Sequence, residues 1–376
     1  MLQLIHPGSR PTVLAGAVLT LTLASDAVLY LLLPLYFESF GLTLVWVGIL
    51  LSANRFVRLL INPWLVPWFQ RYGARTALLQ AVVLASLASL SFVWLHSPWI
   101  LLAARLLWGC AYALMRLGCL HYATQDGGRR MTNLGWYTSL QEVGPLLVLL
   151  LAPLLIGWIS MQAVLLLAFL FCLLAFIPAL MLPAAESERG QSARAQLPWP
   201  NAWHRLTFMV CMLFDGLLLV LFAPLLVADG WSIGMALTLA SALMVMRRLF
   251  NLGLGAVAVR FEWVDDSGAW MMGALLAMLA ASGLITVGAL LPGAALAIVG
   301  HGLFMILAPK QLADAAPSTL ARQQTLNAFT FWRDVAAASG ALLAGLLLSM
   351  NLSLPFYGMA TVILAVLCWQ VRTSIR

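Results

Sequence analysis

Long apolar segments separated by short polar stretches run through the whole chain. A helix that spans a membrane needs about 20 consecutive, mostly apolar residues. Twelve segments meet this length, and most polar stretches between them hold only a few residues. We therefore predict twelve spanning helices, at residues 12–37, 44–69, 76–95, 99–121, 134–158, 161–182, 206–228, 233–257, 269–291, 294–313, 326–349 and 353–372.

One polar stretch is longer than the others and lies at the centre of the chain. Residues 183–204 contain several prolines and separate six apolar segments from six. This pattern predicts an all-α membrane protein with an N-terminal six-helix bundle at 1–182, a cytoplasmic linker at 183–204 and a C-terminal bundle at 205–376.

The composition excludes several classes of protein. Hydrophobic residues make up 63% of the 376 residues and charged ones 9%, against about 45–50% and 25% in a soluble domain. A soluble enzyme or a nucleic-acid-binding module is therefore excluded, although the net charge is +7. The five cysteines lie in apolar runs without disulfide or zinc spacing. We expect no metal, no cofactor and no enzymatic activity, because phosphate-loop and zinc-protease motifs are also absent.

The basic residues outside the apolar segments predict the orientation. Loops on one side carry thirteen of the 20 Lys and Arg residues, and the opposite loops carry none. Basic loops face the cytoplasm, so both termini are predicted to be cytoplasmic. We expect a monomer in the lipid bilayer of a bacterial inner membrane. The thirteen are Arg10, Arg71, Arg75, Arg129, Arg130, Arg189, Arg194, Arg205, Arg260, Lys310, Arg322, Arg372 and Arg376.

The two halves of the chain repeat one another. Transporters are often built from such repeats, with the binding site near mid-membrane between them. Matching acids and arginines at nearly constant spacing indicates a duplicated six-helix unit. A shift of 189 residues aligns Asp26 with Asp215, Arg58 with Arg247, Asn62 with Asn251 and Arg71 with Arg260, and a shift of 192 aligns Glu142 with Asp334.

Three motifs accompany the repeat. The loop VPWFQRYGAR after the second segment contains Arg71, Gly73 and Arg75, with Gln70 before them. The fourth segment contains RLLWG, from Arg105 to Gly109. The fifth contains the pair Gly144-Pro145.

These motifs resemble those of the major facilitator superfamily over essentially the whole chain. The family loop reads roughly G-x-L-a-D-R-x-G-R-R, so Gln70 stands where the family has an aspartate that contributes to a cytoplasmic charge network. The fourth segment matches R-x-x-x-G, and Gly144-Pro145 partly matches a motif of drug-type antiporters. The resemblance implies two six-helix bundles that alternate access, with the loop and these motif residues in gating. For Gly144-Pro145, export by antiport and simple helix packing remain open.

Eleven charged residues lie inside the predicted spans. A charge at mid-bilayer costs at least about 2.5–3.5 kcal/mol, so these residues must pair or line a water-filled cavity. Each is a candidate functional residue, with helix-to-helix pairing as the alternative. They are Arg55, Arg58, Arg105, Arg116, Arg247, Arg248, Arg333, Asp26, Glu142, Asp215 and Asp334.

The surplus of arginine favours an anionic solute, because guanidinium binds carboxylate and phosphate through a planar fork. Arg58 and Arg247 each precede an asparagine by four residues, so each pair shares a helix face. They are candidates for a substrate clamp, or alternatively neutralise Asp26 and Asp215. We expect Arg105 to lie near the outer end of its helix and reach the interface. Further substrate-binding candidates are Arg55, Arg116, Arg333, Asn62 and Asn251.

A proton-coupled carrier needs a titratable group whose environment changes. In exporters that this chain resembles, an acid in the first helix often carries the proton, so Asp26 ranks first and Glu142 second. Asp215 and Asp334 are further candidates. Arg333 is adjacent to Asp334, and adjacent side chains point in different directions on a helix, so no pair is expected there. His301 is either a titratable group or a packed helix contact.

The residues thus predict a secondary active transporter. The leading hypothesis is proton-coupled efflux of a small carboxylate-bearing metabolite, such as a siderophore. The alternative is proton-coupled uptake of an organic anion or a sugar-like solute. An intramembrane enzyme and a non-transporting scaffold are less consistent with the many buried charges.

The orientation is directly testable. Reporter tags fused to either terminus should be accessible only from the cytoplasm, because the basic loops lie on the same side as both ends. Protease protection of the tags in right-side-out vesicles measures this. Cleavage of either tag from outside would contradict the predicted topology.

Overall fold

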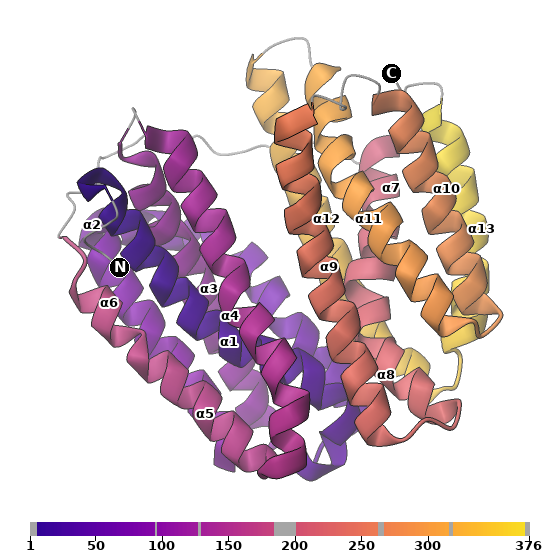
Figure 1. Ribbon diagram of the computed structural model, residues 1–376, viewed down its shortest axis with the longest axis horizontal. Coiled ribbons are helices and arrows are strands. Elements are labelled where there is room, and N and C mark those ends of the chain that lie inside the picture. The colour runs from indigo at the N-terminus through magenta and orange to yellow at the C-terminus, as the bar shows by residue number, and fades with distance from the viewer. Residues whose placement is uncertain are drawn as a thin grey trace. The chain divides into compact units, whose positions relative to one another are not determined.

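The computed structural model describes residues 6–94, 96–126, 129–183, 201–261, 267–315 and 319–372. Every regular element in these ranges is a helix (Figure 1). Residues 184–200, most of the predicted linker, lie outside the description. So do the side chains at 62, 63, 66, 70, 130, 131, 255–261, 267, 319, 320, 322 and 323.

The helices follow one another with short connections. The first half contains η2 (Pro7–Ser9), α1 (Arg10–Tyr36), η3 (Phe37–Phe40), α2 (Leu44–Trp94), α3 (Pro98–Thr124), α4 (Arg130–Trp158), α5 (Met161–Leu174) and α6 (Phe176–Leu180). The second contains α7 (Ala202–Cys211), the π-helix η5 (Met212–Leu217), α8 (Leu218–Ala228), α9 (Ile233–Phe261), α10 (Ser267–Thr286), α11 (Leu290–Asp314), α12 (Thr319–Ser349) and α13 (Ser353–Val371).

Twelve stretches among the described residues are long and apolar enough to cross a membrane, which confirms the predicted twelve-helix fold. The element α2 contains two of them, Leu44–Ile61 and Arg71–Trp94. Gly73 separates its helical parts with φ 79° and ψ 166°. Only glycine adopts such a φ without strain, so a single residue makes the break expected between the second and third spans.

The predicted span at 269–291 is wrong at its C-terminal end. Helix α10 ends at Thr286, and α11 begins at Leu290. Gly288, with φ 82°, makes the turn between them. Residues 292 and 293, which fall between the predicted spans 269–291 and 294–313, therefore lie inside α11. Apolar residues on both sides of Gly288 hide this turn in a hydropathy pattern.

The chain divides into two compact units. One contains Met1–Thr43 and Ala53–Ser192, and the other contains Leu44–Ser52 and Ala193–Arg376. The start of α2 thus groups with the second unit, where Gly48 lies against the backbone of Leu342 and Gly345 in α12.

In the first unit, α1 packs closely against α4 at two glycines. A Cβ added to Gly144 would overlap the carbonyl of Thr20, and one added to Gly16 would lie 3.1 Å from Cβ of Leu140. The Thr20 hydroxyl also donates to the Leu140 carbonyl. Small residues allow such close helix contacts within a membrane.

In the second unit, α12 approaches η5 at two glycines that contact each other, Gly340 and Gly216. A Cβ added to Gly340 would overlap the Met212 carbonyl and lie 2.8 Å from Cα of Gly216. Both neighbouring atoms belong to the backbone and cannot rotate away. This contact fixes the distance between α12 and the π-helix.

Substitution of Gly340 tests this contact. Gly340→Ala should destabilise the protein by about 1–3 kcal/mol, because the added methyl group overpacks a backbone contact. Thermal unfolding of the purified protein in detergent measures the loss.

Gly283→Ala is the matched control, because a Cβ at helical Gly283 meets no atom within 4 Å. Its melting temperature should stay unchanged or rise slightly, since alanine favours helix by up to about 1 kcal/mol. Equal melting temperatures for the two variants would contradict the packing argument.

Candidate functional site

The first unit holds a buried ion pair between α1 and α3. Nη1 of Arg105 lies 2.6 Å from Oδ1 of Asp26. The Arg105 side chain is 1% exposed, and that of Asp26 is 17% exposed. The expectation that Arg105 reaches the membrane interface is therefore wrong. Its long arm turns toward α1 because a buried acid is available there.

The glycine of the fourth-helix motif has a packing role. A Cβ added to Gly109 would lie 2.6 Å from the Asn54 carbonyl oxygen and overlap the side chain of Val57. Gly109 thus brings α3 against α2. Arg105, four residues earlier, makes the charged contact with α1.

Aromatic rings lie against three arginines of this unit. The guanidinium of Arg58 lies 4.6 Å from the ring centroid of Tyr112. Those of Arg55 and Arg105 lie 5.5 and 5.7 Å from the ring of Tyr30. These are favourable cation–π distances. Sequence reasoning missed both tyrosines.

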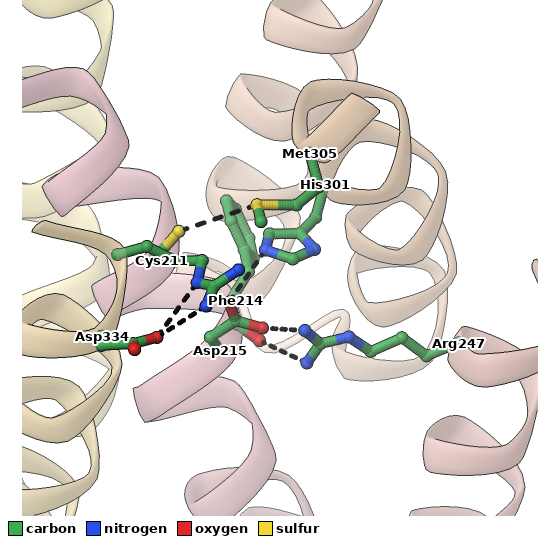
Figure 2. Close-up of polar contacts among 8 residues, drawn as sticks. Cys211, Phe214, Asp215, Arg247, His301, Met305 and Asp334 are labelled. Carbon is green, nitrogen blue, oxygen red and sulfur yellow. Dashed lines mark hydrogen bonds and ion pairs between the residues drawn. The ribbon is translucent and has the colours of Figure 1, made fainter. Parts of the chain in front are cut away.

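A different cluster surrounds Asp215 in the second unit (Figure 2). Asp215 lies on the π-helix η5 and forms an ion pair with Arg247 of α9. Nε2 of His301, on α11, lies 3.2 Å from Oδ2 of the same carboxylate, although the two groups are not aligned as a hydrogen bond. The pairing of Arg247 with the acid of its own half is the alternative left open by the sequence.

The π-helix explains how several helices reach one carboxylate. A π-turn widens the helix locally and is frequent at functional sites. It places Asp215 toward both α9 and α11, whose side chains converge on it in Figure 2. Asp215 is 13% exposed, Arg247 20% and His301 4%. His301 is therefore a buried titratable group in contact with an acid, rather than a simple packing contact.

A second charged pair lies on α12. Nε and Nη2 of Arg333 donate to Oδ1 of Asp334 at 3.0 and 2.9 Å. The expectation that these neighbours do not pair is wrong. Their Cβ atoms point in different directions, but the arginine arm is long enough to fold back. Arg333 also lies within electrostatic reach of His301.

Three potential metal ligands approach one another at Asp215. The donor atoms of Cys211, Asp215 and His301 all lie within 4.8 Å of one another. Cys211 also contacts the Met305 sulfur at 4.0 Å. The guanidinium of Arg247 already binds the carboxylate and would repel a cation, so we assign no metal to this cluster.

The remaining motif residues lie apart from both clusters. The side chain of Gln70 is outside the description. Arg71 is exposed over the ring of Tyr72, at 5.4 Å. Nη2 of Arg75 donates to the Leu180 carbonyl at 2.8 Å and connects α2 to α6. Gly73 makes the break in α2. Their part in gating stays a prediction.

The other predicted residues have individual surroundings. Glu142 and Arg116 are half-buried on α4 and α3, and Pro145 lies inside α4. Asn251 is on α9, and its Oδ1 faces Gly302 of α11. The side chain of Asn62 lies outside the description. Asn251 therefore faces the helix that carries His301, one turn after Arg247.

Comparisons with known proteins agree with this fold. The family model of the Major Facilitator Superfamily matches residues 14–333. The nucleoside transporter NupG is similar with a TM-score of 0.74 at 15% identity, covering 96% of this chain and 98% of that one. A D-xylose–proton symporter has a TM-score of 0.65 at 15% identity, with 96% of each chain covered.

A bacterial homolog of the human lysosomal transporter Spinster, in an inward-facing and occupied conformation, has a TM-score of 0.64 at 16% identity. The match covers 99% of this chain and 94% of that one. These identities show a shared fold only. No sequence match was found among proteins of curated function. Because the family model covers most of the chain, this multi-pass membrane protein belongs to the Major Facilitator Superfamily and is a transporter.

Proposed function

We propose that the protein is a proton-coupled secondary active transporter for a small anionic solute. The observation that carries this proposal is the position of Asp215. It lies within a spanning segment, between a permanent cation and a titratable imidazole. An acid in such surroundings can exchange a proton when its partners move.

The neighbours of Asp215 supply the chemistry of coupling. A guanidinium beside a membrane carboxylate favours the ionised acid, and desolvation without that cation favours the protonated acid. Arg247 of α9 provides the cation, and the His301 imidazole of α11 lies beside the same carboxylate. Nearby polar groups are Asp334 on α12 and Cys211 on α7, both labelled in Figure 2, and Arg333, which pairs with Asp334. Movement of α9 relative to η5 would then load or release one proton.

Asp26 has the surroundings of a fixed counter-ion. Its partner Arg105 is buried and cannot lose its charge in a protein. Separation of the two would leave an arginine in the membrane without its acid, at high cost. We therefore place the transported proton at Asp215, while Asp26 holds α1 and α3 together.

The charge balance supports an anionic solute. In the first unit, four intramembrane arginines accompany two acids, Asp26 and Glu142. Arg105 neutralises Asp26. A water-filled site with surplus guanidinium groups attracts anions and disfavours lipophilic cations.

The direction of transport is left to measurement. The export hypothesis depended on Gly144-Pro145. Close packing against Thr20 accounts for Gly144 without reference to transport. We therefore propose the coupling and the charge of the solute, and the assay below distinguishes uptake from export.

Proton flux in proteoliposomes tests the role of Asp215. Anions such as citrate, succinate and phosphate are added outside vesicles that contain a pH-sensitive dye. A transported anion should acidify the lumen by symport or alkalinise it by antiport. Asp215→Asn should abolish this signal but retain exchange of labelled for unlabelled solute, because exchange needs no net proton movement.

Asp314→Asn is the matched control, because Asp314 is 58% exposed and pairs only with Lys310 one turn away among the described residues. It should behave as wild type. Full proton flux in Asp215→Asn, together with loss in Asp26→Asn, would place the proton at Asp26 and contradict our assignment.

A double-mutant cycle tests the structural role of Asp26. Arg105→Met should destabilise the protein by about 3–5 kcal/mol, since it leaves a buried carboxylate without its cation. The double variant Asp26→Asn/Arg105→Met should recover much of this loss in thermal unfolding. Additive destabilisation by the two changes would show that the pair is not coupled.

A further inference from the structure

The internal repeat extends to a third position that carries chemistry. The shift of 189 residues that aligns Asp26 with Asp215 and Arg58 with Arg247 also aligns Tyr112 with His301. Each half therefore has an acid on its first spanning helix, an arginine on its second and a polar ring on its fourth. The two sets can be compared residue by residue.

The matching arginines have different partners. Arg247 pairs with Asp215, the acid of its own half. In the first half, the acid Asp26 forms its ion pair with Arg105 and not with Arg58. The residue that matches Arg105 at the same shift is Ala294. The second half therefore has no second arginine at that position that could pair with its acid in place of Arg247.

Arg58 is consequently not held by the acid of its half. Its guanidinium lies over the ring of Tyr112. Within the described part of the chain, no acidic side chain lies within ion-pair distance of Arg58. Arg58 is half-buried in a spanning helix, where a charge without an opposite charge is costly.

The contact with Tyr112 places the Arg58 guanidinium over the face of the ring. Stacking uses the flat face of a guanidinium, whereas the N–H donors lie in its plane. These donors match the two oxygens of a carboxylate or phosphate. Arg116 follows Tyr112 by four residues and shares its face of α3. It adds a second positive charge near the ring.

We infer that Arg58, oriented by Tyr112, is the anion-binding group of the first half, and that a carboxylate or phosphate of the solute binds its edge. Arg247, the matching residue, belongs to the proton site instead. This inference rests on the proposed function, because it names the residue that contacts the anionic solute.

Anion binding to the purified full-length protein tests the inference. Thermal shifts with citrate, succinate, inorganic phosphate and 3-phosphoglycerate select the anion that protects best, and its Kd is then titrated. Arg58→Gln should weaken binding roughly ten- to hundredfold, the usual loss for a charge-assisted hydrogen-bonded pair. Arg372→Gln is the matched control, because Arg372 also lies over a ring, that of Trp369, but is exposed at the end of α13.

Further variants separate binding from folding. Arg58→Lys keeps the positive charge but loses the planar pair of N–H donors. It should also bind the anion more weakly, while its melting temperature without anion should equal that of wild type. Tyr112→Phe keeps the ring and should bind within about twofold of wild type, since stacking needs the ring alone. Tyr112→Leu removes the ring and should weaken binding severalfold. Rescue by phenylalanine distinguishes a positioning role from a hydroxyl contact.

The outcomes distinguish the two proposals. If an anion protects wild type and Arg58→Gln and Arg58→Lys bind it equally well, the inference is overturned and the proposed function stands. If no anion of the panel protects wild type, the anionic solute itself is contradicted. Weaker anion binding in the Arg58 variants, together with unchanged binding in Arg372→Gln, supports both the inference and the proposed function.

Discussion

Ionised groups inside a bilayer must meet an opposite charge or water, and this constraint organises the polar contacts of the protein. In the first unit it connects α3 to α1 through Arg105 and Asp26. In the second it connects α9 to η5 through Arg247 and Asp215. The apolar surfaces of these helices give little directional information, because lipid chains are as apolar as leucine. The ion pairs therefore specify which faces of the helices meet.

Close backbone packing supplies the rigidity that these pairs require. Gly216 lies one residue after Asp215 and contacts Gly340 of α12. The same six-residue π-helix thus contains both the acid and the glycine that fixes it against a neighbour. Anchored on α12, it can present one carboxylate to Arg247 and His301 at once.

The sequence predicted the fold well because a spanning helix depends on length and apolarity, which are local properties. It failed where a contact depends on how a long side chain bends. Arg105 was expected at the interface and Arg333 apart from Asp334, yet both arms reach an acid. Tyr112 was missed and the contact of His301 with Asp215 was not predicted, although the shift of the repeat aligns the two residues. The partner of Asp26 was not predictable, since Arg105 has no equivalent in the second half.

Duplication followed by divergence accounts for the unequal use of matching residues. Suppose that Arg58 and Arg247 both bound the solute. Each arriving anion would then take the guanidinium of Arg247 away from Asp215. Proton release would require Asp215 to stay ionised without that cation. The presence of Arg105 in one half removes this conflict. In our proposal, Arg105 pairs with Asp26 and leaves Arg58 for the anion, while Arg247 and His301 remain beside Asp215, the acid that carries the proton. We therefore propose that an arginine at a position where the repeat has alanine is the change that separates anion binding from proton transport.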